Sequence, residues 1–205
     1  MAIKSYFQNI ADAIRVKGGT SALLTPAEMP QAIADLPTGG GGSGVDLTAV
    51  SEVGFIITAQ RNTSESYIQA DRLDLMQGSS VYAFDMQNAT CGVYGGTAIQ
   101  SSNESPQQFW NGHAVGQGKT IISKLTKQRF YLFYIKLSNP VDLSQVDGWR
   151  WWTGNDFPER DPVSFGLFFA NGDEKNGVLQ VMDFAVNYSV TTNRNAIAYE
   201  GSLLK

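Results

Sequence analysis

The sequence predicts a mainly β protein in which a short N-terminal α-helical anchor and a glycine-rich linker precede an antiparallel β-sandwich. Three observations predict this organisation. Residues 38–45 include four successive glycines, a composition typical of flexible linkers. Before this run apolar residues recur at helical spacing, and after it short β-rich runs alternate with turn residues. We therefore expect a helical module at 1–37, a linker at 38–45 and a sandwich domain of jelly-roll type at 46–205.

The helical module consists of two predicted helices with apolar stripes. The first stripe has spacings of four, three and four residues and comprises Ile3, Phe7, Ile10 and Ile14. Glycines at 18 and 19 end this helix. The second helix begins either at the capping box formed by Thr25 and Glu28 or at Pro30, because proline lacks the N–H that an interior position requires.

A module of this size cannot bury its own stripe well, because domains below about 40 residues usually need oligomerisation or another staple. The predicted anchor interface comprises Phe7, Ile10, Ile14, Met29, Ile33 and Leu36. A self-contained helical hairpin is one interpretation. We favour the other, in which the stripe mediates self-association or docking on a larger assembly.

The same region resembles an N-terminal module of bacteriophage and prophage virion proteins, which include tail fibres, baseplate-associated proteins and minor structural proteins. The resemblance rests on IADAIR at 10–15, KGGT at 17–20 and TPAEMPQAI at 25–33. It covers most of residues 6–36. It implies a virion component that these helices anchor or oligomerise.

The part after the linker reads as a series of short strands with intervening turns. Turn residues such as Gln77-Gly78 and Ser138-Asn139-Pro140 separate the runs. Short strands with few helices are typical of a sandwich or jelly roll. The predicted strands lie at 53–59, 66–75, 80–84, 120–125, 130–137, 149–153 and 163–170, with one or two more at 178–190.

Residues 148–165 form the most informative segment. Trp149 and Trp151 share a strand face that we assign to the core. The following loop contains two prolines, which reduce the entropy lost on ordering, and polar residues that bond local backbone. We predict a rigid loop held by Asn155, Asp156, Arg160 and Asp161. A structural tie is favoured over a wall of a ligand site.

The loop and its surroundings resemble a branch of the galactose-binding-like, or discoidin-like, jelly-roll superfamily. The resemblance rests on the pattern NDxPxRDPxS at 155–164, with weaker similarity over 53–190, including SNESP at 102–106. The sequence departs from the family at 109–113, where relatives have a DG turn and a Trp, and at Phe165, where Trp is frequent. The resemblance implies an eight-stranded sandwich, carbohydrate or cell-surface ligands at loops of one end, and structural calcium in some members.

Composition excludes several functional classes. The chain has one His (His113) and one Cys (Cys91), which excludes an intrachain disulfide and zinc sites built from several such ligands. A net charge of −4 argues against general nucleic-acid binding. No apolar run approaches the roughly 18 residues of a transmembrane helix, and the N-terminus lacks the core of a signal peptide. We expect no membrane insertion and no export by a signal peptide of its own.

Catalytic patterns are weak, so we predict no catalytic residues and no enzyme activity. No spacing singles out a carboxylate pair of the kind that glycosidases use, and His113 has no nucleophile motif near it. The GQGKT run at 116–120 lacks the glycine spacing of a phosphate-binding loop.

Sugar binding needs an exposed aromatic platform with polar neighbours. The candidates are Trp110, which lies in a polar stretch, with Asn111, Trp152 and Phe157. The alternative, which we favour, is that these aromatics belong to the core or to a subunit interface. Calcium is the one cofactor considered, with oxygen ligands from Asn155, Asp156 and Asp161.

These observations predict a phage virion structural protein of fibre or decoration type. Its helices would bind other virion proteins or form a homo-oligomer, and its sandwich would bind host-surface carbohydrate with avidity across many copies. Two alternatives stay open: a decoration protein without a ligand, and an enzyme that cleaves polysaccharide. The expected location is the virion.

Overall fold

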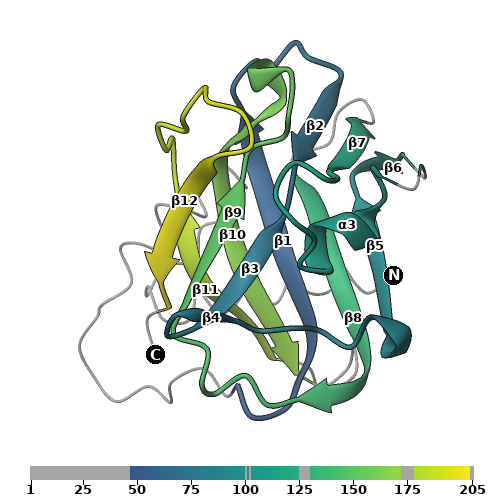
Figure 1. The fold of residues 1–205 in the computed structure, drawn as a ribbon, viewed down its shortest axis with the longest axis vertical. Coiled ribbons are helices and arrows are strands. Elements are labelled where there is room, and N and C mark those ends of the chain that lie inside the picture. Colours follow the sequence, from purple (N-terminus) through teal and green to yellow (C-terminus); the bar gives the residue numbers. More distant parts are fainter. Residues whose placement is uncertain (1–46, 100, 102, 125–129, 172–177, 204–205) are drawn as a thin grey trace, which may run out of the picture.

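The computed structural model describes residues 47–99, 101, 103–124, 130–171 and 178–203 (Figure 1). The predicted helical module, its interface and the linker lie outside the described residues. The described chain is mainly β, as predicted, and every pair of neighbouring strands is antiparallel. No described helix is both long enough and apolar enough to cross a membrane.

Two larger sheets form the two layers of the fold. The five-stranded sheet has the order β11 (Val178–Ala185), β10 (Pro162–Asn171), β1 (Val50–Gln60), β8 (Tyr131–Val141) and β5 (Ala89–Tyr94). The four-stranded sheet has the order β12 (Ile197–Ser202), β9 (Gly148–Trp152), β3 (Leu73–Gln77) and β4 (Ser80–Val81). In Figure 1 the four-stranded sheet lies in front of the five-stranded sheet.

Smaller elements extend one side of the sandwich. A three-stranded sheet has the order β2 (Tyr67–Ala70), β7 (Thr120–Lys124) and β6 (Gly96–Ala98). The helical elements among the described residues are one short α-helix and two single turns: α3 (Pro106–Trp110), η1 (Met86–Asn88) and η2 (Pro158–Arg160). The described residues thus contain twelve strands, where the family resemblance implied eight.

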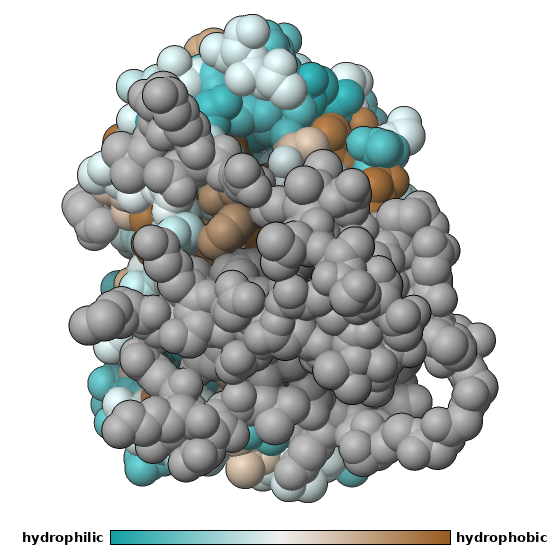
Figure 2. Space-filling model, turned by 180° about the vertical axis from the view of Figure 1, so that it is seen from behind, coloured by the Kyte–Doolittle hydropathy of each residue, from teal (hydrophilic) through white to brown (hydrophobic). Residues whose placement is uncertain are grey.

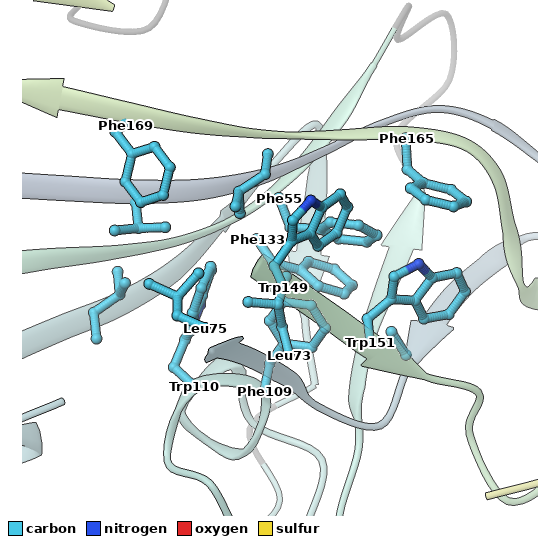
Figure 3. Close-up of a cluster of buried hydrophobic side chains, with 14 of the residues drawn as sticks. Phe55, Leu73, Leu75, Phe109, Trp110, Phe133, Trp149, Trp151, Phe165 and Phe169 are labelled. Atoms are coloured by element: carbon cyan, nitrogen blue, oxygen red, sulfur yellow. The ribbon is translucent and has the colours of Figure 1, made fainter. Parts of the chain in front are cut away.

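Phe55 lies at the centre of the core between the two large sheets (Figure 3). Alternate residues of a strand face opposite sides, so β1 directs Phe55 and Ile57 inward. The ring centroid of Phe55 lies 5.4–6.2 Å from five other aromatic rings, which belong to Phe109, Phe133, Trp149, Trp151 and Phe165. Trp149 and Trp151 are fully buried, which confirms their assignment to the core.

The strand predictions are correct for most of the chain, with informative exceptions. The run predicted at 66–75 is interrupted by Asp71-Arg72, which separates β2 from β3. The predicted turn at 138–140 is wrong, because β8 continues through Pro140 to Val141. Strands β5, β6 and β12 were not predicted, since their glycine-rich or polar sequences acquire strand geometry from pairing with β8, β7 and β9.

Candidate functional site

Three loops meet at one end of the sandwich, at the top of Figure 1. They are residues 61–66, 154–161 and 191–196, and we call them the loop platform. Backbone hydrogen bonds join them directly: the Arg61 N–H donates to the Asp161 carbonyl (2.9 Å), and the Asn195 N–H donates to the Gly154 carbonyl (3.2 Å). This end of the molecule is mainly hydrophilic when seen from behind (Figure 2).

Asp161 is the centre of the platform. Its carboxylate is fully buried and accepts two hydrogen bonds from the Arg194 guanidinium, at 3.0 and 2.5 Å. The Arg61 guanidinium lies 3.7 Å from the same carboxylate. Burial raises the pKa of Asp161 above its ordinary value, and the two arginines oppose that rise. A bidentate arginine bond gives this buried group a fixed geometry.

The two arginines also bind backbone carbonyls of the other loops. Arg61 donates to the carbonyls of Pro158 (3.0 Å) and Val190 (2.7 Å), and Arg194 donates to the carbonyl of Asp156 (3.0 Å). Buried Gln69 donates to the carbonyl of Asp156 (2.5 Å) from below. These bonds satisfy the turn carbonyls that no strand partner reaches, so the platform is one connected unit.

The residues considered as calcium ligands, Asn155, Asp156 and Asp161, bind cationic side chains in the structure. The ammonium of Lys119 lies 2.9 Å from Asn155 Oδ1 and 2.8 Å from Asp156 Oδ2, where a calcium ion would have to bind. Asp161 is bound by arginines instead. A second cation on the same oxygens would be repelled by the first. Within the described ranges, moreover, no three His, Cys, Asp or Glu side chains are grouped as metal ligands.

Lys119 also makes the platform sensitive to acid. Burial would raise the pKa of Asp156, but hydrogen bonds from Lys119 and Gln69 and the charges of Lys119 and Arg160 outweigh it and lower that pKa. A carboxyl whose pKa is lower in the folded state stabilises the fold above its unfolded pKa. That contribution is lost as the pH falls through the folded value.

At about pH 6 we expect wild type to have a higher Tm than Asp156→Asn. This difference in Tm should shrink as the pH falls below roughly 3.9, the pKa of an aspartate in the unfolded chain. Thermal unfolding followed by circular dichroism at several pH values measures it. Glu159→Gln is the control, because Glu159 is an exposed carboxylate of the same loop. A Tm difference that is constant over this pH range would contradict the proposed linkage.

Phe157 is the exposed aromatic residue of the platform. It is 51% exposed, and its backbone has left-handed angles (φ 35°, ψ 75°) that residues other than glycine rarely adopt. The guanidinium of Arg160 lies 4.0 Å from its ring centroid and 4.9 Å from that of Tyr67. Arg160 also pairs with Glu65 at 3.6 Å. Phe157 thus lies at the surface, next to an Arg160 side chain that also contacts Tyr67 and Glu65.

The other predicted aromatic ligands are not at the surface. Trp110 is only 2% exposed, because α3 turns it inward against Phe84 and Phe109, so it cannot be an exposed sugar platform. Trp152 is 7% exposed, because the guanidinium groups of Arg72 and Arg150 cover its ring at 4.9 and 4.7 Å. For these two rings the structure agrees with the favoured alternative, in which they are buried and are not an exposed sugar platform.

The arginines over Trp152 belong to a polar cluster that sequence reasoning missed. Asp74 is 1% exposed, accepts two hydrogen bonds from Arg72, at 2.8 and 2.5 Å, and pairs with Arg150 at 3.3 Å. Asp74 and Arg150 are 76 positions apart in the sequence. They meet because β3 pairs with β9 and places the two residues opposite each other. The alternation of polar and apolar residues at 72–75 was the one signal in the sequence.

His113 links the neighbouring loop to this cluster, because its carbonyl accepts a hydrogen bond from Arg72. Its Nε2 lies 2.8 Å from Oδ1 of buried Asp71, and its Nδ1 lies 3.0 Å from Oδ1 of exposed Asn111. The second oxygen of Asp71 accepts from the Gly116 N–H at 2.8 Å. Asn111 therefore belongs to this loop, in which it bonds His113. Both ring nitrogens of His113 have partners, so the histidine holds the loop in place.

A polar cavity of about 380 Å³ lies at the β4 end of the four-stranded sheet, away from the platform. Its lining includes two exposed carboxylates, Asp147 and Glu200, and the backbone of Gly78, Gly148 and Gly201. Both oxygens of Asp147 accept from the Gly78 N–H, at 3.1 Å each.

Comparison with protein-family models, with curated proteins and with solved structures finds no match for this chain.

Proposed function

We propose that this chain is a phage virion structural protein, of fibre or decoration type, that binds host-surface carbohydrate through its loop platform. In this proposal the sandwich is a jelly roll, and the helical module at 1–37 attaches it to other virion proteins or joins several copies. The resemblance of residues 6–36 to virion modules and of 53–190 to galactose-binding-like domains supports this order of parts.

The observation that carries the binding proposal is the position of Phe157. A left-handed backbone costs an L-residue roughly 1–2 kcal/mol, so the exposed phenylalanine adopts a conformation that its local preference disfavours. An exposed ring can pack against the apolar C–H face of a sugar, while nearby polar groups bond its hydroxyls. Asn155 and Asn62 are exposed on the same platform and supply such groups.

We expect Phe157→Ala to weaken binding to host-cell glycans about tenfold or more, since losing one central aromatic contact removes more than about 1.4 kcal/mol. Glycan arrays and adsorption to host cells, with the full-length oligomer, measure this loss. Val81→Ala is the matched control, because Val81 is 37% exposed and lies on β4, at the other end of the molecule. Equal binding by the two variants would refute a platform site.

The alternative of a decoration protein without a ligand predicts a different result. Adsorption would then be absent or unchanged in Phe157→Ala, and loss of the sandwich would lower assembly or particle stability instead.

The cavity with Asp147 and Glu200 gives the enzyme alternative a definite location, because glycosidases use two carboxylates. The general acid of a glycosidase is usually a buried carboxyl whose pKa is raised by burial. Both of these side chains are exposed. Incubation of host capsule with the wild type and with Glu200→Gln, followed by an assay for new reducing ends, tests it. Activity that the substitution abolishes would favour the enzyme.

A further inference from the structure

The five-stranded sheet carries an apolar patch on the face opposite the core as well, between the polar pairs Glu52–Lys136 and Thr58–Ser164. Strand alternation places Ile56 of β1, Leu132 of β8 and Phe168 of β10 on this outer face, and they are 6%, 1% and 4% exposed. The side chains packed against these three are Tyr94, Phe130 and Tyr134, which lie in or beside strands of the same sheet. We call these six residues the outer-face cluster.

The register of the strands makes the outer-face cluster flat. Gly92, Tyr134, Gly54 and Phe168 form one row across four adjacent strands. A Cβ atom on Gly54 would lie 2.0 Å from Phe168 Cε1, and one on Gly92 would lie 2.3 Å from the Tyr134 hydroxyl. Both rings therefore lie down over the glycines, along the sheet.

A flat apolar face on an antiparallel sheet is normally covered by another layer, because antiparallel sheets leave only a polar face to water. Figure 2 looks at the molecule from the side of this sheet, and hydrophobic residues are visible below its hydrophilic upper end. Ile56, Leu132 and Phe168 are almost inaccessible to solvent, as expected of residues on a covered sheet face. Another segment must therefore lie over this face.

The N-terminal segment fits in position and in size. Residues 1–46 precede β1, a central strand of this sheet, and the segment's predicted stripe needs an apolar partner. Ile56 lies six residues along β1 from Val50, roughly 20 Å at about 3.4 Å per residue. The linker at 38–45 reaches about 16 Å on average and more when extended. A 15-residue helix is about 22 Å long, close to the width of four or five strands.

We propose that the outer-face cluster is the docking surface of the helical module 1–37 of the same chain, whose apolar stripe packs against it. A short linker gives the module a millimolar effective concentration at this face, so a second copy competes poorly. Docking leaves the polar sides of the two helices for contacts with other virion proteins. The inference does not depend on carbohydrate binding.

Methyl NMR on the full-length chain, with isoleucine and leucine methyl groups labelled, tests this docking. We expect NOEs from Ile10, Ile14 or Ile33 to Ile56 and Leu132. Ile10→Asp should abolish them, shift the Ile56 and Leu132 methyl resonances and increase the fluorescence of a bound apolar dye several-fold. Asn9→Asp is the control, because it places the same charge one residue away on the polar side of the helix.

Two results would overturn the proposal. One is the absence of NOEs between the module and the sheet in the wild type, which does not depend on whether any variant folds. The other is that the NOEs appear only between labelled and unlabelled copies in a mixed sample, which would assign the cover to a second copy.

Discussion

Phe55→Ala is expected to lower the free energy of unfolding by about 4 kcal/mol, within the range of roughly 3–5 kcal/mol for a buried Phe→Ala change. Phe55 is fully buried, and five aromatic rings pack around it, from both large sheets and from α3. These rings come from four separate elements, α3, β8, β9 and β10, and cannot collapse together into the space left. A fall in Tm of roughly 8–16 °C should follow for a protein of this size.

Chemical denaturation of the full-length chain measures this loss directly. Phe157→Ala is the matched control, because it removes the same atoms from a ring that is 51% exposed. Its cost should be below about 1 kcal/mol, since a surface ring leaves no cavity. Similar losses for the two variants would show that Phe55 is not at the centre of a tightly packed core.

Asp161→Asn is expected to cost about 3 kcal/mol, near the lower limit for breaking a buried ion pair by removing one partner. The side chain of Asp161 is fully buried, whereas those of Arg194 and Arg61 are 19% and 29% exposed, so water moderates the cost. The asparagine fills the same space but leaves both guanidinium groups without their counter-charge. Their backbone bonds to the other two loops should loosen as a result.

A double-mutant cycle identifies the source of this loss. Arg194→Gln and Asp161→Asn should be strongly non-additive, because each removes the same interaction. Asp156→Asn is the control, since it makes the same chemical change five residues away in a side chain that is 38% exposed, and it should cost clearly less. Additive effects in the cycle would mean that Asp161 stabilises the platform by another route.

The two predictions also separate stability from binding. If the loop platform binds carbohydrate, Asp161→Asn should weaken binding because it disturbs the support of Phe157, whereas Phe157→Ala should weaken binding with little loss of stability. Phe55→Ala should leave binding unchanged at temperatures where the variant is fully folded.

Local pattern was sufficient for much of the fold. The FYLFYIKL run, the alternation around Trp149 and Trp151 and the Gln77-Gly78 turn predicted their elements, because strand alternation and turn chemistry act over a few residues. The polar and proline-rich loop at 154–162 was predicted to be rigid for the same reason. In the structure the loop is also tied by the arginines at 61 and 194, which pair with Asp161.

Burial of the aromatics could not be predicted locally. Trp110 follows a polar stretch, yet α3 turns it into the core, and Trp152 alternates outward, yet two arginines from neighbouring strands cover it. Strands such as β12 became strands through pairing with β9, although their own sequences carry weak strand signals. Each of these outcomes depends on residues distant in the chain.

The sequence by itself therefore determined the class of fold, the two tryptophans of the core and the loop that carries Phe157, because these follow from patterns of two to ten residues. Tertiary structure alone decided which charged side chains form ion pairs. It placed Lys119 on the oxygens of Asn155 and Asp156, set arginines over Trp152, and assembled the outer-face cluster from four strands of one sheet. Ion pairs and sheet faces join residues dozens of positions apart, and only the folded register brings them within contact distance.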